Sequence, residues 1–420
     1  MRIIDSIREK HRTEKLHWML RGYLKNATTV IELYKGQEPL ANFLKKYFAA
    51  DKKFGSKDRK NIAALCYVYF RLGHAAKGLS VEEKILLGLF LCETESQPLL
   101  QLLKPEWNEK ISLSIEEKIT LTRAAVKPAD IFPWQNELSE GIDKTAFSLS
   151  HFIQPFLFVR IRQKARLDMM QRLEKTGWPF TIINNNCIAL PNGCNVEEVF
   201  DIDRNAVVQD YNSQQVFNYA AREEVKLSLK PFRKYYSEFR NVQVLKAFDC
   251  CAGSGGKSIL LYDLMSRSIK PTVCDIRLLI LLNLHQRFKK ANLRYYDYFV
   301  GDMEKNILPE IADSPFPVVI CDVPCTGSGT WGRTPEQLFY FEEKMIDNYA
   351  ARQQKIVTHA VPHLAKGGLL FYITCSVFKK ENENIAAFIQ KKFSLKPVYT
   401  ELLKGYDKKA DSMFVAVFKK

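Results

Sequence analysis

The second half of the chain alternates short apolar runs with segments of helical period, and this alternation restricts the fold more than any other feature. From residue 241 onward the runs are VLKAF, PTVC, DYFV, PVVI and GLLFYI, and a helix-like segment follows each of them. Such alternation is typical of a doubly wound α/β domain with a mostly parallel sheet. We therefore predict this fold class for residues 241–420.

All five runs end on polar residues. In chain order these are Asp249, Asp275, Asp302, Asp322 and the pair Thr374–Cys375. A single Asp after a strand is commonly only a turn residue or a helix cap. In doubly wound sheets, however, ligands bind at the carboxyl ends of the strands, so five polar ends in succession predict one binding site along this edge.

The first strand leads into a glycine-rich loop, DCCAGSGGKS (249–258), which precedes a helix. A Walker A loop would need Gly where Cys251 stands, and a G-x-G-x-x-G fingerprint would need Gly where Ser258 stands. What remains is a tight turn at a helix N-terminus, whose N–H groups favour a carboxylate. With Asp275 placed to bond ribose hydroxyls, the implied ligand is a nucleoside with a small charged tail, and S-adenosylmethionine fits that description.

Charge is unevenly distributed along the 420 residues, whose formal net charge is +15. Residues 1–72 hold 16 Lys and Arg against 7 Asp and Glu, net +9, whereas residues 73–150 hold 8 against 12, net −4. A concentrated basic region, here including Lys45, Lys46, Lys52 and Lys53, suggests a polyanion such as RNA as partner. A solvated helix surface is the alternative interpretation.

Three domains are expected from the length and the patterning. Residues 1–140 carry helix-period patterns and predict an all-helical domain, residues 151–240 look mixed α/β, and residues 241–420 form the doubly wound domain. The ten cysteines include no C-x-x-C pair or zinc spacing, so neither a metal nor a disulfide framework is expected. No apolar stretch approaches the ~20 residues of a membrane span, and the N-terminus lacks a signal-peptide core, so we expect no membrane association and a cytoplasmic protein.

One strand in the middle region has two contrasting faces. In PFLFVRIRQKAR, period-2 alternation places Phe156, Phe158, Arg160 and Arg162 on one face and three aliphatic side chains on the other. The aliphatic face suits a helix such as ARLDMMQRLEK. The rings and guanidinium groups would then face outward and hold RNA bases and phosphates, or they would be the soluble charges of an edge strand.

Several segments resemble the RsmB/Nop2/Sun family of RNA 5-methylcytosine methyltransferases. The segments are DCCAGSGGKS, DVPCTGSGT (322–330), YITCS (372–376), VVQDYNSQQV (207–216), GRTPE (332–336), RIRQKAR (160–166) and the closing DSMFVAVFKK. The helical N-terminus with GSKDRK (55–60) is similar to the NusB-like RNA-binding domain of the bacterial ribosomal RNA branch. Three departures stand out. Arg162 replaces the usual Asn, Ser254 the usual proline, and Ser412–Met413 the usual Gly-Phe.

The resemblance implies a Rossmann-like methyltransferase domain that transfers a methyl group from S-adenosylmethionine to C5 of a cytosine in RNA. Cys375 would be the nucleophile that adds to C6, and Cys325 would assist its release. Asp322 would bond the N3 edge of the base and, if protonated there, stabilise developing negative charge, while Lys257 would lower the pKa of a nearby thiol. We expect the cofactor to be bound by a loop and three aspartates: Cys251, Ala252, Gly253, Ser254, Gly255, Gly256, Lys257, Asp275, Asp302 and Asp322.

The RNA substrate has more than one candidate. The helical N-terminus favours small-subunit (16S) ribosomal RNA, and transfer RNA is the alternative within the family. A monomer without metal is expected. A methyltransferase of another class would commonly carry N/D-P-P-Y/F where this chain has D-V-P-C (322–325). A non-catalytic RNA-binding or ribosome assembly factor that keeps the fold is the other rival.

Overall fold

The computed structural model describes residues 2–51, 53–122, 126–162, 166–236, 239, 242–305, 311 and 315–420. The chain forms two compact units. The first unit comprises Met1–Asn136, Asp143–Gln154 and Trp331–Glu342, and the second comprises Glu137–Ile142, Pro155–Thr330 and Glu343–Lys420. The predicted division into three domains, residues 1–140, 151–240 and 241–420, stays a prediction.

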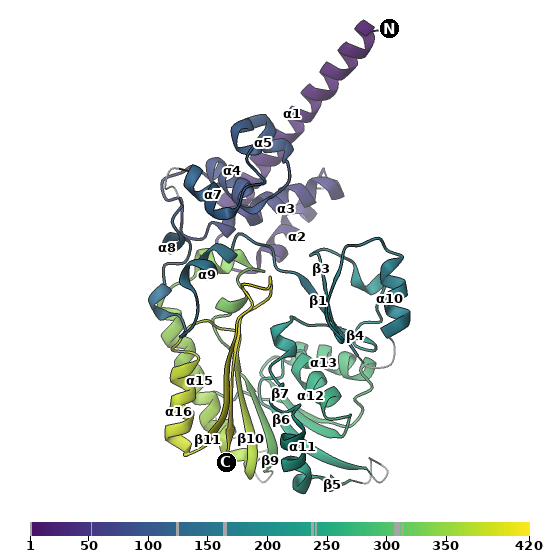
Figure 1. The fold of residues 1–420 in the computed structure, drawn as a ribbon, viewed down its shortest axis with the longest axis vertical. Coiled ribbons are helices and arrows are strands. Elements are labelled where there is room, and N and C mark those ends of the chain that lie inside the picture. Colours follow the sequence, from purple (N-terminus) through teal and green to yellow (C-terminus); the bar gives the residue numbers. More distant parts are fainter. Residues whose placement is uncertain are drawn as a thin grey trace. The chain divides into compact units, whose positions relative to one another are not determined.

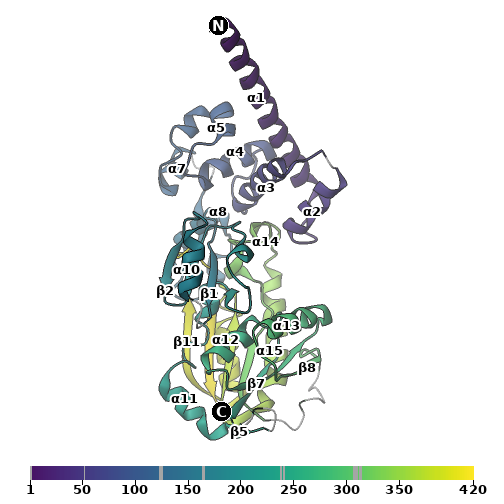
Figure 2. The ribbon, with the colours of Figure 1, turned by 90° about the vertical axis from the view of Figure 1, so that its right-hand side faces the viewer.

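The first unit is helical, as predicted for the N-terminal region. Two of its helices start at a serine N-cap with a reciprocal glutamate, Ser80 with Glu83 and Ser114 with Glu117, so the capping-box pattern in the sequence marks both starts. Figures 1 and 2 show α1 as one continuous helix. Among the described helices of the chain, none has both the length and the apolar character needed to cross a membrane. The helices of this unit are α1 (Arg2–Leu33), α2 (Leu40–Ala50), α3 (Ser56–Arg71), α4 (Val81–Cys92), α5 (Pro98–Leu103), α6 (Pro105–Asn108), α7 (Ile115–Leu121), α8 (Pro128–Ile131), α9 (Lys144–Ser150) and α14 (Pro335–Tyr340).

Helix α14 is supplied to this unit from a segment nearly two hundred residues further along the chain. The Tyr340 hydroxyl donates to the carbonyl of Tyr34 at 2.7 Å, and the two rings meet edge to face. The buried guanidinium of Arg71 on α3 donates to the carbonyl of Gly332 at 3.0 Å. The GRTPE segment is therefore part of the helical unit's core.

The basic cluster on and after α2 is partly neutralised by neighbouring carboxylates. Lys45 and Lys46 are exposed, and Lys46 Nζ lies 2.8 Å from Glu38. Lys53 Nζ lies 2.6 Å from Asp51. Lys52 lies outside the described residues.

The second unit contains a small antiparallel sheet with the strand order β2-β3-β1-β4. Helix α10 (Arg166–Glu174) packs on one face of this sheet, with Met169 and Leu173 in a core that also contains Val159 and Ile161. The aliphatic face of the strand was predicted correctly. The strands are β1 (Leu157–Ile161), β2 (Thr181–Asn184), β3 (Cys187–Leu190) and β4 (Ala206–Val208).

The other face of β1 is not the exposed surface that the sequence predicts. Phe158 is 2% exposed, Arg160 6% and Arg162 3%. Moreover, β1 is an internal strand, paired with β3 and β4. Both interpretations of this face, a solvent-facing RNA platform and an edge strand, are wrong. Strand β1 is paired on both sides, and α12 (Gly256–Leu264) supplies the partly exposed Asp263 as an ion-pair partner for both guanidinium groups.

The large sheet of the second unit has the strand order β11-β12-β10-β9-β6-β7-β8, with β5 paired to β6. The five predicted runs form β6 to β10 in chain order, and these strands pair in parallel. Strands β11 and β12 add an antiparallel edge. The doubly wound α/β prediction is therefore confirmed. The strands are β5 (Lys234–Tyr235), β6 (Gln243–Asp249), β7 (Ile269–Asp275), β8 (Asp297–Val300), β9 (Phe316–Asp322), β10 (Leu364–Thr374), β11 (Lys396–Leu403) and β12 (Met413–Lys419).

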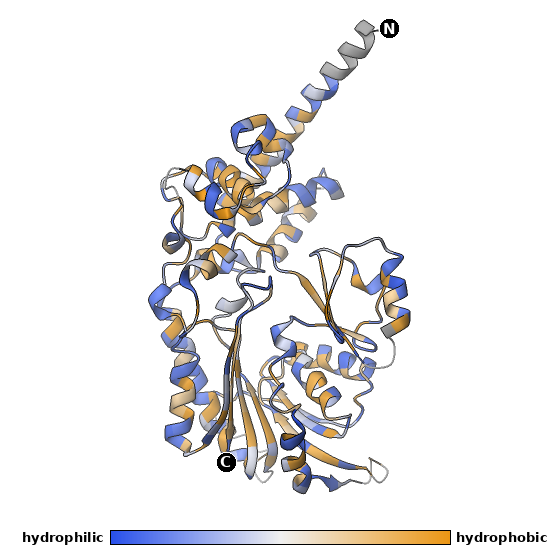
Figure 3. Ribbon diagram, viewed as in Figure 1, coloured by the Kyte–Doolittle hydropathy of each residue, from blue (hydrophilic) through white to orange (hydrophobic). Residues whose placement is uncertain are grey.

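Helices cover both faces of this sheet. On one face α12 and α13 (Leu278–Lys290) join Val273 and Phe371 in one core, and on the other α15 (Lys344–Ala360) and α16 (Glu383–Phe393) join Phe248 and Tyr372 in another. Helix α11 (Glu223–Leu229) contributes to the first core. In Figure 3 the central strands are mainly hydrophobic, whereas α15 and α16 carry both hydrophobic and hydrophilic residues. The two apolar layers hold the carboxyl ends of the parallel strands at one edge.

Candidate active site

The carboxyl ends of the parallel strands border a pocket of about 700 Å³. Every residue predicted for catalysis or cofactor binding lines this pocket, except Gly255. The residues come together because β10, β9, β6 and β7 are neighbours and all run in the same direction. Polar side chains that follow parallel strands must then meet at one edge of the sheet.

The glycines of the loop after β6 have different functions. Gly255 has φ +81° and caps α12, and a Cβ placed there would lie 2.5 Å from a ring carbon of Phe288. Gly253 has φ +53°, but a Cβ there would meet no described atom within 4 Å. Gly255 is therefore needed for packing beneath the loop, whereas Gly253 lets the backbone turn beside open space in the pocket wall.

Ser254, which stands where the family usually has proline, anchors this loop. Arg287 Nη1 on α13 donates to the Ser254 hydroxyl at 2.8 Å and to its carbonyl at 3.0 Å. Arg287 is itself paired with Asp203 at 2.8 Å. A side-chain contact thus restrains the loop where a proline ring would restrict the backbone.

Asp275, at the end of β7, has its carboxylate oxygens engaged by the protein. Oδ2 accepts from the Gly253 N–H at 3.0 Å, and both oxygens accept from the Arg277 guanidinium at 2.9 and 3.0 Å. Burial raises the pKa of Asp275, but the hydrogen bonds from Arg277 outweigh burial and the net pKa is lowered. Asp302 accepts from the Glu304 N–H at 3.0 Å. Because the Arg277 side chain is mostly exposed, it can move aside for a hydroxyl-bearing ligand.

Cys325 and Cys375 lie side by side on the turns after β9 and β10. Their Sγ atoms are 3.1 Å apart, so the thiol of one donates to the sulfur of the other. This contact, together with burial, raises the pKa of Cys325. The sequence predicted this pairing because β9 and β10 are parallel neighbours.

Lys257 makes its close contact with a carboxylate. Its Nζ lies 2.6 Å from Asp322 Oδ2. Burial lowers the pKa of Lys257, but the charge of Asp322 raises it more, so the net pKa is raised. The predicted lowering of a thiol pKa by Lys257 does not apply to Cys325, whose pKa is raised.

Asp249, at the end of β6, is buried beneath the pocket. Its Oδ2 accepts from the Ser258 hydroxyl at 2.6 Å, and its Oδ1 has no partner among the described residues. Burial raises the pKa of Asp249 to about 7. This aspartate, predicted as one of the five strand ends, is a carboxyl group close to its titration point at neutral pH.

Glu381 is a residue of the site that sequence reasoning missed. It is 0% exposed and lies under both cysteine turns. Its Oε2 accepts from the hydroxyls of Thr326 and Ser376, the residues that directly follow Cys325 and Cys375, and its Oε1 accepts from the Thr326 N–H at 2.9 Å. The surrounding KKENEN segment is hydrophilic, so nothing in the sequence distinguishes this glutamate from a surface residue.

The turn after Cys325 also packs against the segment that carries the Ser412–Met413 departure. The Ser412 N–H donates to the Gly329 carbonyl at 2.9 Å, and a Cβ on Gly329 would lie 2.0 Å from the Ser412 carbonyl oxygen. Gly329 therefore permits the close approach of two backbones. The Ser412 hydroxyl accepts from the Gly405 N–H at 3.1 Å.

Comparison with known proteins gives consistent matches. Residues 239–417 match the profile of the family described as 16S rRNA methyltransferase RsmB/F. Two curated proteins named ribosomal RNA small subunit methyltransferase B are similar to this chain. The protein from Proteus mirabilis is 26% identical over 250 residues, which cover 56% of this chain and 52% of that protein. The protein from Shewanella oneidensis is 32% identical over 142 residues, which cover 34% of this chain and 32% of that protein. The matched segments thus span about half or less of these relatives.

Two solved structures share the fold. The protein PH0851 aligns with a TM-score of 0.65 at 17% identity and covers 96% of this chain and 98% of its own. A methyltransferase homolog protein from Pyrococcus horikoshii aligns with a TM-score of 0.54 at 17% identity and covers 73% and 100%. These likenesses show a shared fold. The match of residues 239–417 to a methyltransferase family is what indicates a Rossmann-like methyltransferase domain there, with S-adenosylmethionine as its cofactor.

Proposed function

We propose, from the match of residues 239–417 to the family described as 16S rRNA methyltransferase RsmB/F, that the protein methylates C5 of a cytosine in small-subunit ribosomal RNA through a covalent cysteine adduct. The observation that carries the proposal is the pair of thiols 3.1 Å apart on the wall of the cofactor pocket. The names of the curated relatives and the basic N-terminal region support RNA of the small subunit as substrate.

The residues of the pocket fit S-adenosylmethionine. Asp275 ends β7 where a ribose would be bound, and open space lies beside Gly253 for an approach to the backbone. The pocket also carries several carboxylates, which suit a sulfonium cation. When bound, S-adenosylmethionine supplies an electrophilic methyl group.

Cys375 is assigned as the nucleophile. C5 of cytosine is too weak a nucleophile to take a methyl group unaided. When the Cys375 sulfur bonds to C6, electron density moves to C5, which can then attack the methyl carbon. After the transfer, C5 carries both a proton and the new methyl group, and loss of the proton from C5 breaks the bond between C6 and sulfur.

Cys325 is assigned to that second half of the reaction. A thiol with a raised pKa gives a strongly basic thiolate once its proton has left, so the Cys325 sulfur suits removal of the C5 proton. Its position next to Cys375 brings it to the same base. Both thiols give up their protons to solvent before they react. Cys325 becomes a thiol again by taking the C5 proton, and Cys375 leaves C6 as a thiolate that takes one proton back from solvent, so the reaction releases one proton overall.

Lys257 and Asp322 are assigned to binding and orientation of the base. Asp322 lines the pocket three residues before Cys325, within reach of the N3 edge of a base bonded to Cys375. Lys257 holds the Asp322 carboxylate through the 2.6 Å ion pair. A fixed carboxyl group can hydrogen-bond to the base as charge develops on the ring.

The test combines product mapping with adduct trapping. Labelled S-adenosylmethionine and 16S ribosomal RNA should yield labelled 5-methylcytosine. On a denaturing gel, Cys325→Ser should accumulate a protein band shifted by bound RNA, whereas Cys375→Ser and the double variant should not. Cys194→Ser, outside the pocket, is the matched control and should behave as wild type.

Each other outcome contradicts a part of the proposal. A shifted band with Cys375→Ser would exchange the roles of the two cysteines. Methyl transfer to a base nitrogen, or to transfer RNA alone, would replace the product or the substrate. If both variants retain turnover, the covalent route is wrong, and if wild type never transfers a methyl group, the chain acts as a binding factor.

A further inference from the structure

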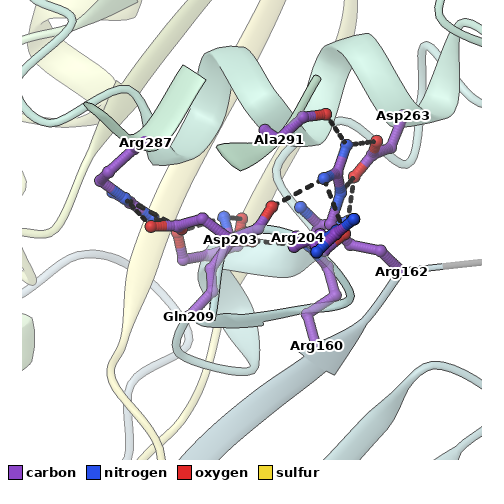
Figure 4. A network of polar contacts seen from close by, with 9 residues as sticks. Arg160, Arg162, Asp203, Arg204, Gln209, Asp263, Arg287 and Ala291 are labelled. Carbon is purple, nitrogen blue, oxygen red and sulfur yellow. Dashed lines mark hydrogen bonds and ion pairs between the residues drawn. The ribbon is translucent and has the colours of Figure 1, made fainter. Parts of the chain in front are cut away.

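A buried group of charged residues joins the small sheet to α12 and α13 of the second unit (Figure 4). Arg162 uses all its donors: it bonds both oxygens of Asp263 at 2.7 and 2.9 Å and the carbonyls of Asp203, Arg204 and Ala291. Its charge and its hydrogen bonds are therefore satisfied within the protein.

Arg160 is not satisfied in the same way. Its Nε donates to Gln209 at 2.9 Å and its Nη1 to Asp263 at 2.8 Å, but Nη2 has no partner among the described residues. Burial lowers the pKa of this guanidinium. Two arginines thus share the single carboxylate of Asp263, which leaves one positive charge in excess at a buried position. An uncompensated buried charge is costly unless a counter-ion approaches it.

A second pocket, of about 710 Å³, lies against this group and is distinct from the active-site pocket. Its size is in the range of about 300–1,000 Å³ that is typical of ligand sites. Arg160, Arg162, Lys226 and Arg267 line it, and Asp263 is the carboxylate among the lining residues, so the lining carries a net charge of +3. Lys226 Nζ also lies 2.8 Å from Glu223, an exposed residue outside the lining. Amide side chains from two further segments complete it: Asn184, Asn185, Asn186, Gln214, Gln215 and Asn218.

Cationic and amide side chains in one pocket are the groups that proteins use to hold nucleic-acid phosphates and sugars. The pocket is also connected to the active site. Gln209, which accepts the hydrogen bond from Arg160, lines the active-site pocket. Arg160, which lines the second pocket, and Gln209, which lines the active-site pocket, therefore form part of the wall between the two pockets.

We propose that this second pocket binds a backbone phosphate of the substrate RNA, with Lys226 and Arg267 as the donors and the buried Arg160 guanidinium as an added positive charge behind the pocket wall. The inference rests on the proposed function for the identity of the RNA. The pocket sets the register of the RNA chain relative to the active site, while the cysteines do the chemistry.

The test measures binding of a fluorescent single-stranded oligoribonucleotide over a series of salt concentrations, without cofactor. Two variants probe the donors, Lys226→Ala and Arg267→Asn. Asparagine suits the left-handed backbone at residue 267, where φ is +61°. Arg172→Ala on α10 is the charge-matched control outside the pocket. Inorganic phosphate and cytidine monophosphate serve as competitors.

We expect each variant to weaken binding by at least about tenfold, as the loss of a charge-assisted hydrogen bond predicts. For Lys226→Ala and Arg267→Asn the salt slope should also fall by about 0.7 per lost contact. The control should bind as wild type, and thermal unfolding and cofactor affinity should be unchanged in all variants.

Unchanged RNA affinity and salt slope in both variants would overturn the proposal, as would an equal loss of affinity in the control. Strong competition by free cytidine monophosphate or phosphate, with little dependence of RNA binding on these residues, would assign the pocket to a free nucleotide or anion instead. Because no methyl transfer is measured, failure of the proposed function would leave these binding results intact.

Discussion

Replacing Glu381 tests whether one buried carboxylate holds the two cysteine turns in place. In Glu381→Ala, the Thr326 N–H and the Gln353 side-chain amide lose acceptors at 2.9 Å. The hydroxyls of Thr326 and Ser376 can turn to Ser328, and Gln353 keeps a bond to the Pro324 carbonyl. An unsatisfied buried donor costs about 1–3 kcal/mol, so the expected loss of unfolding free energy is about 2–4 kcal/mol.

The effect on catalysis should exceed the effect on cofactor binding. Glu381 bonds the residues that follow Cys325 and Cys375, and a displacement of a reacting group by ~1 Å can cost about 10²-fold in rate. The loop 251–257 has no bond to Glu381 in the described contacts, so affinity for S-adenosylmethionine should be unchanged. We expect kcat to fall by about two orders of magnitude.

Glu381→Gln is the matched control. Its remaining oxygen can still accept from the Thr326 N–H and from Gln353, and its amide can donate to the two hydroxyls, which can accept as well as donate. The measurements are urea unfolding followed by far-UV circular dichroism, hydrogen exchange at the Thr326 amide, and single-turnover methyl transfer. Wild-type stability and rate in Glu381→Ala would refute the reasoning, and so would equal losses in both variants.

Three further predictions follow from charged groups. Burial raises the pKa of Asp249 to about 7, so the unfolded chain releases this proton at lower pH than the folded chain does, and wild type loses stability as the pH rises from about 4 to about 7. In urea unfolding at pH 8, the unfolding free energy of Asp249→Asn should therefore exceed that of wild type by about 2–4 kcal/mol. Parallel profiles of stability against pH for the two proteins would contradict this. Asp275→Ala should weaken S-adenosylmethionine binding by ~1.5–3 kcal/mol in calorimetry, and unchanged affinity would remove Asp275 from the site. Neutral residues at Lys45, Lys46 and Lys53 together should reduce RNA affinity and flatten its salt dependence without changing cofactor affinity; unchanged binding at low salt would identify a solvated surface.

The arrangement of the strand ends was predictable because it depends on local pattern and on a general rule of parallel sheets. The apolar runs gave the strands, and the rule placed Asp275, Asp322 and the cysteines at one edge. The contact between Cys325 and Cys375 then follows from adjacent strands, without any knowledge of side-chain packing.

The partners of charged residues were not predictable in this way. Alternation correctly separated the two faces of β1, but it carries no information about what covers each face. Asp263 lies about a hundred residues from Arg160 and Arg162, so no local pattern indicates that it pairs with them. Glu381 was missed for the same reason, because a hydrophilic segment is buried here by partners that only the folded chain brings together.

The late contribution of α14 to the helical unit has a consequence for the order of folding during synthesis. Helices α1 to α9 leave the ribosome long before residues 331–342 are made. The surfaces around Tyr34, Phe70 and Arg71 therefore stay uncovered until Gly332 and Tyr340 have been synthesised. A nascent chain is thus expected to expose an aromatic surface through most of its synthesis, when aggregation is a hazard. A fragment that stops before residue 331 would keep that surface uncovered, so the helical unit is discontinuous in the chain and does not end where its first run of helices ends.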